Sequence, residues 1–331
     1  EGPHIYRRNG YYYLLTAEGG TEYDHAVSLA RSRDIFGPYE IHPNNPILTS
    51  SGNPELKLQK AGHASLVETP QGEWYMPHLC GRPLPDSKNC NLGRETAIQK
   101  VEWHQDNWLY LAGGENQPKM EVPAPNLKPH PWPALADRLP FDSPHYATPR
   151  GLSSSVMPEP NSLTLHGAES LESNFEQAML ARRLTSQNLT ATTKISFKPE
   201  NFQQMAGLAA YYNTYLFHYL YLSMDEEKGL CLQIHSCDDG KSNFPLGGEI
   251  IPVSNNELFL RASFNDKRLQ FYYSHCGQDF LKIGPVLDAS ILSDDHGEHW
   301  GFTGTFVALA CQDLTGKKLP ATFEFLELCN N

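Results

Sequence analysis

Short segments of alternating apolar and polar residues recur along the chain, separated by turns rich in Gly, Asn, Asp and Pro. The clearest pair, residues 5–8 and 11–15, flanks Asn9-Gly10, a dipeptide that readily takes the positive φ angles of a type I′ turn. Two further pairs follow the same pattern: 64–68 with 74–76 across Pro70-Gln71-Gly72, and 97–101 with 108–110 across Gln105-Asp106-Asn107. This pattern predicts antiparallel β-blades rather than helices.

The C-terminal half has similar segments, which are short, β-branched or aromatic, and end at Gly, Asn or Asp. They are residues 191–197, 207–212, 230–235, 258–264, 269–274 and 322–328. Such a pattern is typical of a β-sandwich, and a region of this size suits a jelly roll of two sheets. The predicted fold class is therefore all-β, with blades followed by a sandwich.

A proline-rich stretch divides the two halves. Nine prolines lie between Gln117 and Arg150, a density that excludes regular helix or central strand and favours an extended linker. The predicted organisation is residues 1–117 for the blades, 118–150 for the linker and 151–331 for the sandwich.

Composition narrows the class of protein. Over 331 residues, 40% hydrophobic and 19% charged residues are ordinary for a well-cored protein, and a net charge of −12 argues against a nucleic-acid partner. No apolar run is long enough for a membrane span. Seven cysteines, an odd number without a CxxC pair, predict reduced thiols and a cytoplasmic location, with secretion left open because the chain starts within a motif. The chain has no GxSxG elbow, P-loop or HExxH motif.

Several sequence blocks resemble glycoside hydrolase family 43, in particular its β-xylosidases with a C-terminal sandwich. The blocks occur in collinear order over essentially the whole chain: Glu1-Gly2-Pro3-His4, residues 11–21, Gly62-His63-Ala64-Ser65, residues 92–97, and residues 302–306 with Cys311-Gln312-Asp313. The resemblance implies a five-bladed β-propeller with an axial active site. It also implies inverting removal of terminal xylose, and often of arabinofuranose, from xylan fragments.

The resemblance makes Glu1 the general acid. Inverting hydrolysis also needs a carboxylate across the sugar that activates water, about 6.5–9.5 Å from the acid. The resemblance places that base, and a second aspartate that tunes the acid, in earlier blades that have no counterpart here. We therefore expect the N-terminal part of the propeller as a separate or missing chain.

The resemblance also assigns other residues to the site. It places His63 near the propeller axis, in contact with a water or a cation beneath the sugar, whereas a histidine ahead of a strand can equally be a satisfied polar residue. It makes Arg94 the arginine that binds sugar hydroxyls. The alternatives are an ion pair of Arg94 with Glu95 or Glu102, and Arg82 as the substitute.

Two residues of the sandwich are candidates by resemblance alone. Phe302 is expected to close the pocket as a lid, or else to pack between domains. Asp313 could join a structural calcium site, or else cap a turn. The expected chemistry requires no cofactor, and calcium is the one metal that the resemblance suggests. Asp24 and His25 follow residues 18–21 in a polar loop and are expected to border the pocket, without a role that the sequence assigns.

The first hypothesis is that the protein is an exo-acting, inverting β-xylosidase that acts on xylo-oligosaccharides. The sequence does not decide whether it also has α-L-arabinofuranosidase activity. The alternatives are a catalytically inactive sugar-binding fragment and a sandwich that mainly builds oligomers. A homo-oligomer is expected. The preference for xylose or arabinose depends on pocket walls that the earlier blades supply in part.

Overall fold

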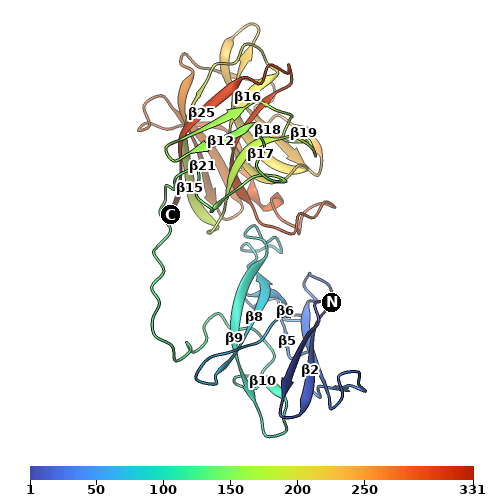
Figure 1. Cartoon of the computed structure of the whole chain (residues 1–331). Coiled ribbons are helices and arrows are strands. Elements are labelled where there is room, and N and C mark those ends of the chain that lie inside the picture. The colour runs from blue at the N-terminus through green and yellow to red at the C-terminus, as the bar shows by residue number, and fades with distance from the viewer. The chain divides into compact units, whose positions relative to one another are not determined.

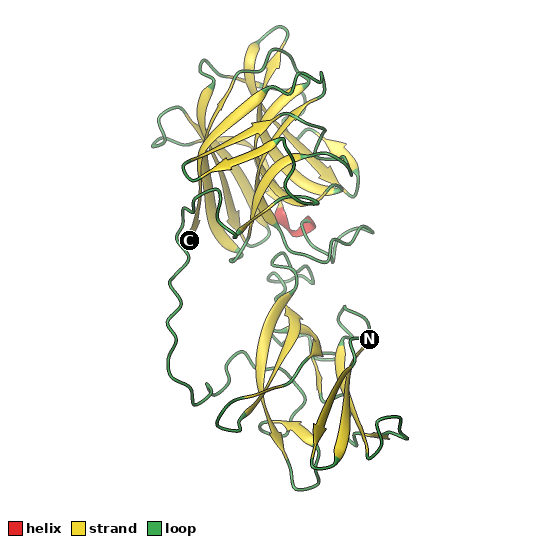
Figure 2. Cartoon of the chain, in the orientation of Figure 1, coloured by secondary structure: helices red, strands yellow, loops and turns green.

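The computed structural model describes residues 1–331, and all of its regular elements are strands except one short 3₁₀ helix (Figures 1 and 2). The all-β prediction is confirmed. The chain forms two compact units: unit 1 comprises Glu1–Pro83 and Arg94–Pro133, and unit 2 comprises Leu84–Gly93 and Ala134–Asn331. No helix has the length and apolar character that a membrane crossing requires.

Unit 1 consists of two antiparallel five-stranded sheets, each a blade of the propeller type. The first contains β1 (His4–Arg8), β2 (Tyr11–Glu18), β3 (Ala26–Ser32), β4 (Glu40–Ile41) and β5 (Leu48–Thr49). The second contains β6 (Gln59–Ala64), β7 (Val67–Glu68), β8 (Trp74–Gly81), β9 (Glu95–Trp103) and β10 (Leu109–Leu111).

The predicted Asn9-Gly10 turn joins β1 to β2. Arg8 pairs with Tyr11, and both turn residues have positive φ angles, 48° at Asn9 and 74° at Gly10. This is the backbone twist that suits a two-residue hairpin loop. Alternation along β2 then sends Tyr13 and Leu15 into the core of unit 1, where the Tyr13 ring lies 4.6 Å from that of Trp103.

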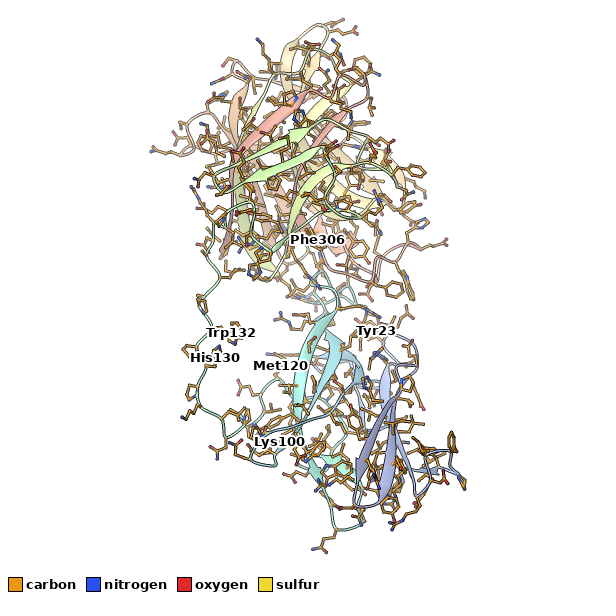
Figure 3. All side chains as sticks on the ribbon, viewed as in Figure 1. Tyr23, Lys100, Met120, His130, Trp132 and Phe306 are labelled. Carbon is orange, nitrogen blue, oxygen red and sulfur yellow. The ribbon has the colours of Figure 1, made fainter.

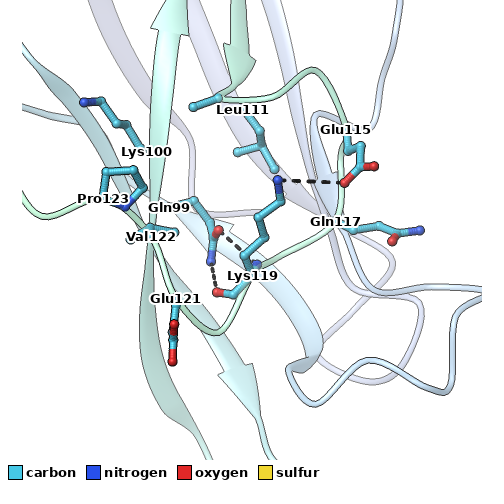
Figure 4. Close-up of a pocket in the computed structure, with 10 residues that line it drawn as sticks. Gln99, Lys100, Leu111, Glu115, Gln117, Lys119, Glu121, Val122 and Pro123 are labelled. Carbon is cyan, nitrogen blue, oxygen red and sulfur yellow. Dashed lines mark hydrogen bonds and ion pairs between the residues drawn. The ribbon is translucent and has the colours of Figure 1, made fainter.

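The segment after β10 is held by a buried side chain of β9. The amide of Gln99 donates to the Lys119 carbonyl and accepts from the Lys119 backbone N–H, both at 3.0 Å (Figure 4). Gln99 thus pairs with this segment as a neighbouring strand would. A pocket of about 200 Å³ lies beside the pair and is lined by charged side chains, among them Glu115 and Lys119 (Figure 4).

Unit 2 is a two-sheet sandwich. The eight-stranded sheet contains β11 (Tyr146–Ala147), β14 (Ala178–Arg183), β24 (Phe306–Asp313), β16 (Gln204–Asn213), β17 (Leu216–Asp225), β18 (Gly229–Asp238), β19 (Lys241–Asn243) and β20 (Ile251–Pro252). The seven-stranded sheet contains β12 (Val156–Glu159), β13 (Ser162–His166), β25 (Pro320–Asn330), β15 (Asn188–Phe197), β21 (Glu257–Asn265), β22 (Arg268–Ser274) and β23 (Leu281–Asp288). The 3₁₀ helix η1 (Ala289–Ile291) follows β23.

The core of unit 2 lies between these sheets. Fully buried phenylalanines of the seven-stranded sheet, such as Phe271 and Phe323, share one apolar cluster with Leu208 and Leu309 of the other sheet. A second buried cluster, which includes Tyr219, covers the opposite face of the eight-stranded sheet. That sheet is therefore apolar on both faces.

The proline-rich segment has no regular strand between β10 and β11 (Figure 2). Trp132 within it is 82% exposed, and its ring lies 5.0 Å from that of His130 (Figure 3). The division between the units, at Pro133 and Ala134, falls inside the predicted 118–150 linker, so the second half of that range belongs to unit 2. An isolated bridge from Arg138 to Glu327 is consistent with this division.

The loop between β8 and β9 departs from the predicted boundary, because Leu84–Gly93 belongs to unit 2. The Asn89 side chain donates to the Ser290 carbonyl at 2.8 Å, and the Asn91 side chain donates to the Ala289 carbonyl. The backbone carbonyl of Asn91 accepts from the Thr305 backbone N–H at 2.8 Å. These bonds join the loop to η1 and to the segment before β24, at separations in sequence that no hairpin pattern can reveal.

Candidate active site

Glu1 lies at the open end of the first blade. Its backbone N–H and C=O both pair with Ala17 of β2, each at 2.8 Å, which extends the β1–β2 ladder. Gly2 follows with φ +54°, and a Cβ there would lie 2.5 Å from Nε2 of His63. Glycine at this position therefore lets the backbone beside Glu1 pack directly against the His63 ring.

His63 comes from β6 of the second blade, where the pairing with β8 shifts register on either side of Gly62. The backbone at His63 has φ +48°, an uncommon angle for a residue with a side chain. This local irregularity directs His63 toward Glu1. The carboxylate of Glu1 and ring nitrogens of His25 and His63 all lie within 4.8 Å of one another.

His25 is the buried member of this three-residue cluster, with only 1% of its surface exposed. Its Nδ1 lies 3.1 Å from the carbonyl oxygen of Lys60, and its Nε2 is buried with no hydrogen-bond partner. The ring packs flat on Gly62, where a Cβ would come within 2.4 Å of it. Burial is the main cause that lowers the pKa of His25, because it disfavours the charged imidazolium.

A pocket of about 410 Å³ opens beside the cluster and has a largely polar lining. The polar residues that line it are His63, Ser65, His78, Arg94, Glu95 and Thr96. The structure thus brings two of the predicted site residues, His63 and Arg94, to one pocket. A wall rich in hydrogen-bonding groups and imidazoles suits a ligand with many hydroxyl groups.

Arg82, the alternative to Arg94, is committed to an ion pair. Its guanidinium makes a bidentate contact with the Glu95 carboxylate, with Nη2 of Arg82 2.7 Å from Oε1 of Glu95. The hydrogen bond to Glu95 raises the pKa of Arg82. Glu95 is therefore the partner of Arg82. Sugar binding by Arg94 stays a prediction.

Phe302 belongs to unit 2 and lies on the loop before β24. It is 53% exposed, has φ +50°, and packs edge to face with Trp300 at 5.7 Å. The carboxylate of Asp294 accepts the Phe302 backbone N–H at 2.9 Å, which supports this unusual conformation. An exposed aromatic ring held on a strained loop is compatible with a lid, and that role stays a prediction.

Asp313 ends β24 and is buried. Its carboxylate accepts hydrogen bonds from the Thr315 backbone and hydroxyl, from the Leu319 backbone N–H at 2.9 Å, and from the Gln204 amide. These bonds match the turn-capping alternative. They leave little of the carboxylate for a cation, so they do not support the calcium role, which stays a prediction.

Acid should weaken unit 2 through Asp313. Burial acts to raise the pKa of Asp313, but the hydrogen bonds from Thr315 and Leu319 outweigh it and hold the pKa below its ordinary 3.8. Stability from this group is therefore complete above pH 3.8 and is lost as pH falls below it. We expect Asp313→Asn to lower the free energy of unfolding by about 1–3 kcal/mol at pH 7. The difference from wild type should shrink below pH 3.8, as measured by urea titration. A difference that stays constant with pH would contradict this account.

The cluster of Glu1, His25 and His63 is the one group whose geometry could hold a metal. Calcium prefers six to eight oxygen ligands, whereas two of the three donors here are imidazole nitrogens. In addition, a carboxyl group cannot donate a proton and ligate a metal through the same oxygen. The donor set therefore does not fit calcium.

Two family descriptions cover most of the chain. Residues 1–109 match "Glycosyl hydrolases family 43", and residues 137–328 match "Beta xylosidase C-terminal Concanavalin A-like domain". The chain belongs to glycoside hydrolase family 43. In this family, the two sheets of unit 1 are blades of the propeller and unit 2 is the appended sandwich, as the sequence blocks predicted.

Known proteins of this family are similar to this chain over almost all of its length. Xylosidase/arabinosidase 43B of Humicola insolens is 43% identical over 98% of this chain and 63% of its own length. The β-xylosidase of Bacillus subtilis is 42% identical over 98% of this chain and 64% of its own length. The crystal structure of xylan β-1,4-xylosidase from Bacillus halodurans superposes with a TM-score of 0.95 at 45% identity, covering 99% of this chain and 65% of that one. The chain thus spans less than two thirds of these relatives.

Proposed function

We propose that this chain forms the acid-bearing part of an exo-acting, inverting glycoside hydrolase that removes terminal β-D-xylose from xylo-oligosaccharides. The observation that carries the proposal is the grouping of Glu1 with His63, which in turn lines the pocket that contains Arg94. Glu1 heads the first family block, and the family match supports its assignment as the general acid.

In the proposed mechanism, Glu1 protonates the glycosidic oxygen as the bond to the sugar breaks. A carboxylate on the opposite face, about 6.5–9.5 Å away, removes a proton from the attacking water. We propose that this base comes from the blades that precede Glu1 in a complete propeller. Arg94 binds sugar hydroxyls through several directed donors. His63 lines the same pocket as this arginine and belongs to the cluster that contains the acid.

Arabinofuranose is the second sugar that we propose for the pocket. The relative from Humicola insolens is named for both activities, whereas the one from Bacillus subtilis is named for xylose alone. Discrimination between two pentoses depends on which hydroxyl groups find partners in the pocket. We propose that the polar wall of unit 1 supplies part of these partners and that the earlier blades supply the rest.

The predicted product pattern tests the exo-acting mode. The protein with a complete propeller should release xylose and xylotriose from xylotetraose in equal initial amounts, with no xylobiose, because cleavage occurs only at the terminal sugar. The product ratio is measured by anion-exchange chromatography over the first few percent of conversion. Release of internal fragments from longer xylo-oligosaccharides would contradict the exo mode.

A sugar-binding fragment without turnover is the second candidate. Binding of xylotriose in calorimetry with no product after prolonged incubation would favour it. The cytoplasmic location, the homo-oligomer and a separate N-terminal propeller chain stay predictions from the sequence.

A further inference from the structure

Two side chains with hydroxyl groups line the pocket of Arg94 and have no part in the mechanism above. They are Ser65, which follows β6, and Thr96 of β9. We propose that Ser65 and Thr96 bind two different hydroxyl groups of the terminal sugar, whose ring lies on the apolar surface of β8 between them. The inference rests on the proposed function and adds to it the residues that recognise the edges of the sugar.

The middle strand of this pocket presents an apolar surface. β8 lies between β6 and β9, and its half-buried residues Pro77 and Leu79, two positions apart, both line the pocket. Proline is uncommon in a central strand because it removes a hydrogen bond from the ladder. Its flat ring at this position, beside Leu79, gives a surface on which the C–H groups of a sugar ring can pack.

Ser65 and Thr96 lie on opposite sides of this apolar surface. Thr96 pairs with Leu79 across the β8–β9 ladder, so the two side chains share one face of the sheet. On the other side of β8, the backbone N–H of Ser65 donates to the Pro77 carbonyl at 3.1 Å. Two strand spacings, about 10 Å, therefore separate the backbones of Ser65 and Thr96. With a hydrogen bond of about 2.8 Å at each end, this distance leaves room for one sugar ring across β8.

Both hydroxyl groups are available to a ligand. Neither the Ser65 nor the Thr96 side chain has a hydrogen-bond partner within the protein. The Glu95 carboxylate in the same wall is, by contrast, held by the Arg82 guanidinium. A serine or threonine hydroxyl both donates and accepts, so each can pair with a sugar hydroxyl in either direction.

His78, which also lines the pocket, is held by the protein at both ring nitrogens. The Leu79 carbonyl can only accept, so Nδ1 of His78, 2.9 Å away, carries the proton. Nε2 then accepts from the Gln99 amide nitrogen at 3.4 Å. Burial lowers the pKa of His78, which favours this neutral ring. His78 thus has no N–H left for a sugar, and the hydroxyl groups of Ser65 and Thr96 supply the directed contacts.

The test pairs each protein hydroxyl with each sugar hydroxyl. The substrates are 4-nitrophenyl β-xyloside and its 2-, 3- and 4-deoxy analogues, with the protein that has a complete propeller. Thr96→Val nearly keeps the side-chain shape but removes the hydroxyl. It should raise KM for the parent substrate about 3–10-fold and change kcat less than about 2-fold, because the lost hydrogen bond is also made in the ground state.

The deoxy analogues separate sugar binding from general damage. One analogue should show no further loss with Thr96→Val, since it already lacks the hydroxyl that Thr96 binds, and the other two should lose as much as the parent. Ser65→Ala should show the same behaviour with a different analogue, because Ser65 lies on the opposite side of β8. Thr96→Ser retains the hydroxyl and should keep KM within about 2-fold of wild type.

Equal losses on all four substrates would overturn the inference, since they would show that Thr96 affects the pocket only through its structure. Selection of the same sugar hydroxyl by Ser65 and Thr96 would also overturn it, because the ring would then not lie between them. Thr164→Val is the matched control. Thr164 is a half-buried strand threonine of β13 that does not line the pocket, so KM should not change for any substrate.

Failure of the proposed function gives a different result, since wild type would then not hydrolyse the parent substrate at all. In that case the same comparison is made on affinities for xylose and its deoxy analogues, measured by calorimetry. Loss of the coupling between Thr96 and one sugar hydroxyl in both measurements would overturn the inference itself.

Discussion

Replacing Glu1 with Gln should abolish xylobiose hydrolysis, with a fall in kcat of about 10²–10⁴-fold, the usual contribution of a general acid. The amide has nearly the shape of the acid but has no proton to give to the glycosidic oxygen. Its neighbours His25 and His63 stay in place, because the backbone contacts of residues 1 and 2 do not change. The measurement is initial xylose release by wild type and Glu1→Gln, each with a complete propeller.

The same variant should bind the sugar almost normally. KM for xylobiose and the affinity for xylose, measured by calorimetry, should change less than about threefold, because an interaction made only in the transition state affects kcat. Glu18→Gln is the matched control, since Glu18 is an exposed residue at the end of β2 outside the cluster. Full activity in Glu1→Gln would refute the assignment of the acid.

Replacing Gly93 with Ala should lower the free energy of unfolding of unit 2 by about 2–5 kcal/mol. Gly93 has φ +69°, an angle that costs an L-residue about 1–2 kcal/mol. A Cβ there would also lie 1.9 Å from the backbone oxygen of Thr303. The backbone shift that removes such overpacking typically lowers stability by about 1–3 kcal/mol more. Because the obstacle is backbone, no side-chain rotation can remove it.

Gly229→Ala is the control for this effect, since Gly229 has φ +77° but no atom within 4 Å of the added carbon. Gly229→Ala should lower the free energy of unfolding only by the cost of the positive φ angle, about 1–2 kcal/mol. Both variants are compared by urea titration with circular dichroism. Equal destabilisation of the two would show that the contact with Thr303 is not a constraint in solution.

Local signals in the sequence predicted much of the fold. Asn9-Gly10 specified a hairpin because few dipeptides tolerate two positive φ angles, and β15, β21 and β22 alternate because only one face of their sheet meets the core. β17 lacks that alternation. Its Leu220 faces the core between the sheets and its Tyr219 faces the second apolar cluster, so both faces are buried and the period of two disappears.

The site was predictable only where a motif carried it. His63 and Arg94 lie in family blocks, and the structure brings them to one pocket. From the sequence alone, His25 is only a polar residue in a loop, because its contacts are with Gly62 and Lys60 of another blade. Likewise, the loop 84–93 looks like an ordinary hairpin connection until Asn91 is seen bonded to Ala289, 198 residues away.

The central claim is that Glu1 serves an inverting glycosidase, and the configuration of the released sugar tests it most directly. Proton NMR during the first minutes of 4-nitrophenyl β-xyloside hydrolysis, before mutarotation, distinguishes the two anomers of the released xylose, which is the only sugar that this substrate forms. The account predicts that α-xylose appears first and equilibrates later, because water attacks the face opposite the leaving group. Initial release of β-xylose would indicate a retaining reaction and would contradict the account.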